Sequence, residues 1–132
     1  MVRNVEKGDD IKKTAKRLCE NRSHYNSNDY VEREIIDDVK QKDYLKELVS
    51  EVISSLHGND GNIRLGAAEI LGVITPLSMV NVVLEELKKH LNDNFIRDYA
   101  YGGFQGDEYD MRTVAECCRA SIKKLNKLVV EN

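Results

Sequence analysis

Residues 62–74 read NIRLGAAEILGVI, and this stretch decides the fold. Its apolar residues recur at the three- and four-residue steps that place side chains on one face of an α-helix. They are Ile63, Ala67, Ile70, Leu71 and Ile74. Small residues at 66–68 and at Gly72 predict that neighbouring helices approach this one closely, because little or no side chain stands between the backbones.

Five other segments carry helical periodicity, and none alternates apolar and polar residues as a half-buried strand would. They span about residues 9–21, 29–40, 43–57, 76–91 and 109–129. Asp29 with Glu32 resembles a capping box at the start of the second helix. Gly58 stands where a left-handed cap would end the third helix, and Thr75 before Pro76 is expected to cap the fifth. The pattern predicts an all-α fold.

The links between these segments predict how the helices pair. We expect one domain, 1–132, built as a short α-solenoid of about three antiparallel helical hairpins at 9–40, 43–74 and 76–129. Neighbouring hairpins would bury the apolar faces that a single helix leaves exposed. A stack this short has two open ends, which favours association into a homo-oligomer.

Composition limits the classes of function. The chain has 20 Lys and Arg against 23 Asp and Glu, so nucleic acid is not the expected partner, since its binding usually needs a basic excess. No stretch approaches the roughly 20 apolar residues of a membrane span, and the N-terminus lacks the apolar segment of a signal peptide. The odd set of cysteines, Cys19, Cys117 and Cys118, is typical of a reduced, cytoplasmic chain.

The stretch from Asn62 to Gly72 resembles the second helix of a HEAT repeat of the phycobilisome-lyase HEAT-like type. That helix reads V/I-R-x-x-A-A-x-x-L-G after an Asp-rich turn, and here the turn is Gly58-Asn59-Asp60-Gly61. Arg64 and Ala67 are its repeat residues. The resemblance covers residues 43–129 and implies a scaffold that binds a protein partner along stacked helices, without catalytic residues or a cofactor.

A second copy of this pattern lies near the C-terminus. Met111, Arg112 and Ala115 match Ile63, Arg64 and Ala67 at a spacing of 48 residues. Subtracting an insertion of about 14 residues leaves a period near 34, within the range of helical-hairpin repeats. Glu116 stands where the repeat has a second alanine. Both arginines are expected to be structural and to pair with an aspartate of their own or a neighbouring turn.

Residues 95–109 form the long link inside the last hairpin, and they hold five of the eight aromatic residues of the chain. Long links between packed helices are uncommon and are often functional. Aromatic side chains also dominate interface hot spots. We therefore predict that this segment binds the protein partner, while a loop that merely covers the core is the alternative. The predicted partner-binding residues are Phe95, Tyr99, Tyr101, Phe104 and Tyr109.

Two other classes of function stay open at this stage. Arg17 with His24 has the spacing of helical ribonucleases, and Glu34 with Asp37 has half of the carboxylate pattern of helical nucleotide pyrophosphohydrolases, so a small enzyme acting on nucleotides or RNA is one alternative. The basic strip of the first helix makes a nucleic-acid-binding helical module another; it consists of Lys12, Lys13, Lys16 and Arg17.

The histidines and cysteines predict no further chemistry. No cluster has the spacing of a zinc site, so no metal is expected. His24, His57 and His90 all fall near predicted helix C-termini, where a cation interacts favourably with the helix dipole. Cys118 lies on an apolar stripe, so packing is the expected role of the Cys117-Cys118 pair.

Overall fold

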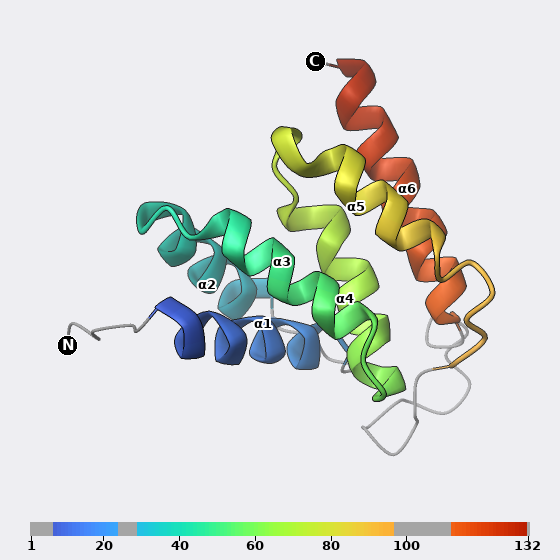
Figure 1. Ribbon diagram of the computed structural model, residues 1–132, viewed down its shortest axis with the longest axis horizontal. Coiled ribbons are helices and arrows are strands. Elements are labelled where there is room, and N and C mark those ends of the chain that lie inside the picture. The colour runs from blue at the N-terminus through green and yellow to red at the C-terminus, as the bar shows by residue number, and fades with distance from the viewer. Residues whose placement is uncertain (1–6, 24–28, 97–111, 132) are drawn as a thin grey trace.

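The computed structural model describes residues 7–23, 29–96 and 112–131, and this part of the chain is all-α (Figure 1). The helices are α1 (Lys7–Ser23), α2 (Asp29–Gln41), α3 (Leu45–Leu56), α4 (Gly61–Ile74), the 3₁₀ turn η1 (Leu77–Met79), α5 (Val80–Lys88) and α6 (Val114–Glu131). Within these ranges the only β-type pairing is an isolated bridge between Ile96 and Thr113. No helix there is long and apolar enough to cross a membrane.

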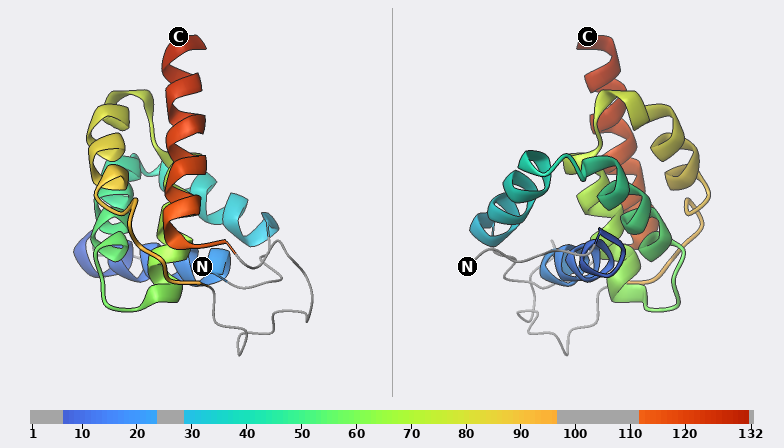
Figure 2. Two further views of the ribbon diagram at one scale, coloured as in Figure 1. Left: turned by 90° about the vertical axis from the view of Figure 1, so that its right-hand side faces the viewer. Right: turned by 60° about the vertical axis from the view of Figure 1, so that its left-hand side comes forward.

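Helix α4 is the centre of the fold. It packs against α1 on one side and α6 on the other, while α3 contacts both α1 and α4, and α5 packs on α6 (Figures 1 and 2). Helix α2 lies on the side of the molecule away from α5 and α6 (Figure 1). Although α2 follows α1 in the chain, α1 makes its main contacts with α4 and α3. The six expected helices are present. The main partners of α1, however, are α3 and α4, and not α2, with which a hairpin was predicted.

The small residues of α4 allow its neighbours to come close, as the sequence predicted. A Cβ atom added to Gly66 would overlap the carbonyl oxygen of Cys19 in α1. One added to Gly72 would lie 2.6 Å from the Ser121 hydroxyl of α6, which itself donates a 2.5 Å hydrogen bond to the Ala68 carbonyl. Both helix contacts are thus made through backbone and small side chains, which larger residues would push apart.

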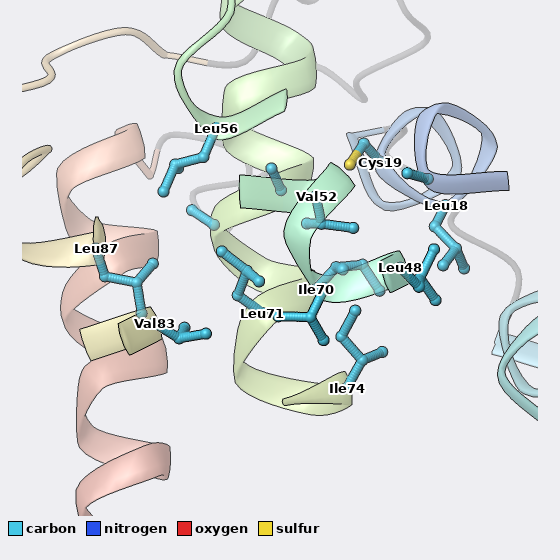
Figure 3. Close-up of a cluster of buried hydrophobic side chains, with 14 of the residues drawn as sticks. Leu18, Cys19, Leu48, Val52, Leu56, Ile70, Leu71, Ile74, Val83 and Leu87 are labelled. Atoms are coloured by element: carbon cyan, nitrogen blue, oxygen red, sulfur yellow. The ribbon is translucent and has the colours of Figure 1, made fainter. Parts of the chain in front are cut away.

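Side chains of α1, α3 and α5 meet those of α4 in the core (Figure 3). Leu18 of α1, Leu48 and Val52 of α3, Leu71 of α4 and Leu87 of α5 are all fully buried. They close the space between elements that are distant in the sequence, so the described helices share one continuous core.

Several helix ends differ from the sequence prediction. Thr75 does not cap the fifth helix: its hydroxyl donates to the Leu71 carbonyl at 2.6 Å, and the residue ends α4. Threonine can satisfy its hydroxyl on the carbonyl four residues earlier, and here that bond wins. Pro76 then precedes the short turn η1, and α5 begins only at Val80.

The C-terminal cap of α3 is also different. Gly58 does not have a positive φ angle, and its N–H instead bonds to the Ser55 carbonyl at 3.1 Å, a tightened last turn. The left-handed residue is Asp43, with φ 59°, after α2. Its N–H bonds to the Lys40 carbonyl, and the Tyr44 N–H bonds to the Val39 carbonyl, the paired bonds of a Schellman motif.

The starts of α2 and α6 are held by different contacts. Glu32 of α2 accepts two hydrogen bonds from Arg22 of α1, at 2.9 and 2.7 Å. Its predicted capping box with Asp29 stays a prediction, because the side chain of Asp29 lies outside what the structure describes. The last helix begins at Val114, later than the expected residue 109, because Thr113 and Glu116 form a capping box. The Thr113 hydroxyl accepts from the Glu116 N–H, and the Glu116 carboxylate accepts from the Thr113 N–H, both at 3.1 Å.

Candidate functional site at the turn between α3 and α4

The turn from His57 to Asp60 joins α3 to α4 and is held from both of its ends. Asp60 is the N-cap of α4, and its side chain accepts from the Asn62 N–H at 2.9 Å. Arg64, one turn into α4, reaches back and donates to the carbonyl oxygens of Gly58 and Asn59, both at 3.2 Å. Because three of the four turn residues are fixed in this way, the turn can serve as a rigid support for the groups around it.

Arg64 also ties this turn to the segment that follows α5. Its guanidinium donates to both oxygens of Asp93, at 2.8 and 3.4 Å. Burial opposes ionisation of Asp93, yet the hydrogen bonds from Arg64 and from the Phe95 N–H lower the pKa of this carboxyl below its usual value. The pairing is of the structural kind expected for this arginine, with an aspartate of a neighbouring segment.

The residues that precede and follow the segment 97–111 meet next to this ion pair. Ile96 and Thr113 form the isolated bridge, the Val114 N–H bonds to the Phe95 carbonyl, and the Ala115 N–H bonds to the Asp93 carbonyl, both at 2.9 Å. We call these backbone contacts the neck. The neck brings together residues 96 and 113, so the stretch between them begins and ends at one place on the molecule.

Phe95 is the one predicted partner-binding aromatic that the structure describes. Its ring packs on the first turn of α4, where a Cβ atom at Gly61 would overlap it, and the Arg64 guanidinium lies 5.7 Å from the ring centroid. Phe95 is therefore partly buried against the core. Tyr99, Tyr101, Phe104 and Tyr109 lie outside the described residues, so their role stays a prediction.

On its other side, the turn borders a groove of about 530 Å³ between α1 and the end of α3. The groove is lined by Lys12, Lys16, Glu51, Ser54, Ser55, Gly58, Asn59, Asp60 and Ile63. Lys12 and Lys16 are exposed, and neither pairs with an acidic residue within 7–23, 29–96 or 112–131. The two ammonium groups thus share the groove with the carboxylates of Glu51 and Asp60, although neither lysine forms an ion pair with them.

Beyond the groove and the neck, the turn takes part in a third contact, a cluster of histidines and carboxylates at the end of α5. His57 Nδ1 lies 2.7 Å from His90 Nε2, and His57 Nε2 lies 2.7 Å from the Glu86 carboxylate. His90 Nδ1 faces Asp93 at 3.7 Å. Hydrogen bonds from Lys89 and then from His57 lower the pKa of Glu86, whereas burial first and the nearby charge of His57 second lower the pKa of His90.

Comparison of this chain with protein-family models, curated proteins and solved structures finds no match.

Arg112, the other arginine singled out in the sequence, lies in a separate network on α4. Its guanidinium donates to Glu69 at 2.6 Å, and Arg22 of α1 lies 3.9 Å from the same carboxylate. Arg22 in turn binds Glu32 of α2. This chain of charges joins four segments of the fold. Among the described residues, the acidic partner of Arg112 is Glu69, a residue of α4; the aspartates of the turn before Arg112 lie outside those residues, so the predicted pairing with a turn aspartate stays a prediction.

The remaining residues singled out in the sequence lie apart from one another. Ala67 and Ala115 are buried, and their assignment as repeat residues stays a prediction. Burial raises the pKa of Cys19 and Cys118 to about 12, so these thiols stay protonated at neutral pH and serve packing. Glu34 and Asp37 are exposed on α2, Arg17 is exposed on α1, and His24 lies outside the described residues. Among those residues, no three His, Cys, Asp or Glu side chains could jointly hold a metal ion.

The histidine cluster and the groove are the features that sequence reasoning missed. His57 and His90 are 33 residues apart, and each position was explained by its own helix C-terminus. The only available signal was that each of the two predicted helices has a histidine at or next to its last residue, which becomes informative once His57 and His90 are known to be in contact.

Proposed function

We propose that this protein is a non-catalytic, cytoplasmic interaction module of HEAT-like type, which binds a protein partner at the end formed by the α3–α4 turn. The neck carries this proposal. It fixes both ends of an aromatic-rich segment to the packed core through Phe95, Asp93 and the bridge from Ile96 to Thr113. Anchoring both ends reduces the conformational freedom that the segment loses on binding.

The groove suggests the chemistry of the partner. Lys12 and Lys16 stand four residues apart on α1, beside the hydroxyls of Ser54 and Ser55. Ile63, near the start of α4, adds an apolar side chain to the lining of the same groove. A partner segment with acidic side chains fits the lysines, since exposed cations attract and orient an oppositely charged partner. The aromatic segment would then supply the contact area and the groove the charge complementarity.

The proposal is tested by separating binding from folding. Replacing Tyr99, Tyr101 and Phe104 together by alanine is expected to abolish partner binding, because buried aromatic rings supply most hot-spot energy, while the melting temperature changes little. The measurement compares cross-linked partners from the native host, then affinity for the identified partner by calorimetry. A collapse of the melting temperature would instead place these rings in the core.

The groove has its own matched comparison. Lys12→Ala with Lys16→Ala removes two charges that line the groove, whereas Lys13→Ala with Arg17→Ala removes two charges of the same helix that do not line it. We expect only the first pair to weaken binding, by roughly tenfold, and to reduce its salt dependence. Equal loss in both variants would show that α1 contributes general charge and that the groove is not the site.

A further inference from the structure

The contact between His57 and His90 has room for a single proton. Their facing nitrogens are 2.7 Å apart, a hydrogen-bond distance at which one nitrogen donates and the other accepts. Two imidazole rings that were both fully protonated would point two N–H groups at each other there. The contact therefore exists only while the pair as a whole lacks one of its four possible protons.

The outer nitrogens are set by the carboxylates. Glu86 lies 2.7 Å from His57 Nε2 and favours a proton on that atom, and Asp93 on the far side favours one on His90 Nδ1. Both carboxyls are held ionised, since their pKa values are lowered. The hydrogen bond between the rings needs one proton on the two facing nitrogens, and a second proton there removes it.

The surroundings resist a second charge. Every element packed around the pair contributes a group: Arg64 from α4 and Lys89 from the end of α5 are cationic, while Glu86 and Asp93 already have cationic partners. Cys118 of α6 lies near Asp93 as a neutral thiol. His90 is also largely buried, with 15% of its side chain exposed, so a charge added there is poorly hydrated.

We propose that the His57–His90 pair is a pH-sensitive connection between the C-terminal end of α3 and the C-terminal end of α5. A single proton between the facing nitrogens holds the α3–α4 turn against α5, and acidification that places a proton on both of these nitrogens separates the rings. The Arg64–Asp93 ion pair and the neck do not depend on this proton. Separation of the two rings therefore releases the contact of the α3–α4 turn with α5, while the contact of Arg64 with Asp93 is kept.

The sign of the effect follows from linkage. Because the folded protein lowers the pKa of His90, the unfolded chain binds more protons just below the usual value of about 6.5, and stability rises with pH in that range. The contribution is complete above about 6.5 and is lost as the pH falls below it. Glu86 and Asp93, with lowered pKa values, lose their contributions only at more acidic pH.

Nuclear magnetic resonance can follow this pair directly, because the chain has only three histidines. In the wild type we expect a ring-to-ring Overhauser contact between His57 and His90 at pH 7.5 that disappears at pH 5. In His57→Gln the midpoint of the His90 titration should move up by about 1 unit, the size typical of coupled sites. His24→Gln serves as the control and should leave both signals unchanged.

The melting temperature gives a second readout. Between pH 7.5 and pH 5 it should fall more in the wild type than in His57→Gln or in His90→Gln, since neither variant can form the pair. A His90 titration that is the same in the wild type and in His57→Gln overturns the proposal. So does an Overhauser contact that persists at pH 5 when both rings are protonated.

Discussion

Two regions of α4 are stabilised by different interactions: the N-terminal turn by polar contacts, and the rest of the helix by close packing. Toward α1 and α6 the helix presents Gly66, Ala67, Ala68 and Gly72, and contacts are set by how closely backbones approach. At its N-terminal turn the contacts are polar and paired, from Arg64 to Asp93 and from His57 to His90. The first region depends on shape and tolerates no added atom. The second depends on protonation and charge, so it can change with pH or with a partner while the core stays intact.

The strongest test of this contrast is Gly66→Ala. The added methyl group would overlap the Cys19 carbonyl, which is backbone and cannot turn aside, so α1 must shift as a whole. We expect a loss of about 3 kcal/mol of unfolding free energy, at the upper end of overpacking effects. Chemical denaturation measures it.

Gly58→Ala is the matched control for this change. Its Cβ would lie 3.3 Å from the Ser55 carbonyl at an ordinary φ, so a loss below about 1 kcal/mol is expected. Similar losses in the two variants would mean that the close approach of α1 and α4 is not what limits the core.

Arg64→Met should have the next largest effect. It keeps much of the apolar stem but removes the bonds to Gly58, Asn59 and Asp93, leaving a partly buried carboxylate without its cation. We expect a loss of about 2 kcal/mol and faster amide exchange at Val114 and Ala115 in the neck. Arg119→Met, which removes one 3.3 Å bond from an exposed arginine to the Leu91 carbonyl, should change little by either measure.

Asp93→Asn separates charge from shape at the same site. Asparagine can still accept from Arg64, so the expected loss at pH 7 is smaller, about 1 kcal/mol. Since the pKa of Asp93 is lowered in the folded protein, its charge contributes above the unfolded value near 3.9 and is lost as the pH falls. The stabilities of the variant and the wild type should therefore converge as the pH falls from the unfolded value toward the lowered pKa of folded Asp93. A difference that does not depend on pH would assign the effect to packing.

The same contrast explains what the sequence could and could not predict. The apolar and small residues of α4 indicated both the helix and its close contacts, because they act through local periodicity and residue size. The packing partner of α1 was not predictable. The order of the helices in the chain suggested α2, whereas in the structure α1 packs mainly against α4. Thr75 had two possible hydrogen-bond partners and local patterns could not rank them. His57 and His90 meet only through tertiary packing, which no local signal encodes.

The smallest expected effect is that of introducing a glycine at position 43. Asp43 has a φ of 59°, a left-handed conformation that is unfavourable for most side chains, in the Schellman motif after α2. Asp43→Gly should relieve that cost, and part of the gain is offset by the greater freedom of glycine in the unfolded chain, so stability should rise by about 0.5 kcal/mol. Asp37→Gly, the same substitution at an exposed position inside α2, should lower stability by about 1 kcal/mol. Thermal denaturation of the two variants under the same conditions measures both changes in stability.

If both substitutions lower stability, the aspartate side chain of Asp43 stabilises the turn through its own contacts, and these outweigh the cost of the backbone conformation. If Asp43→Gly raises stability and Asp37→Gly lowers it, the benefit of glycine at position 43 comes from its backbone freedom. At Gly66, by contrast, glycine is needed because a side chain would overlap α1.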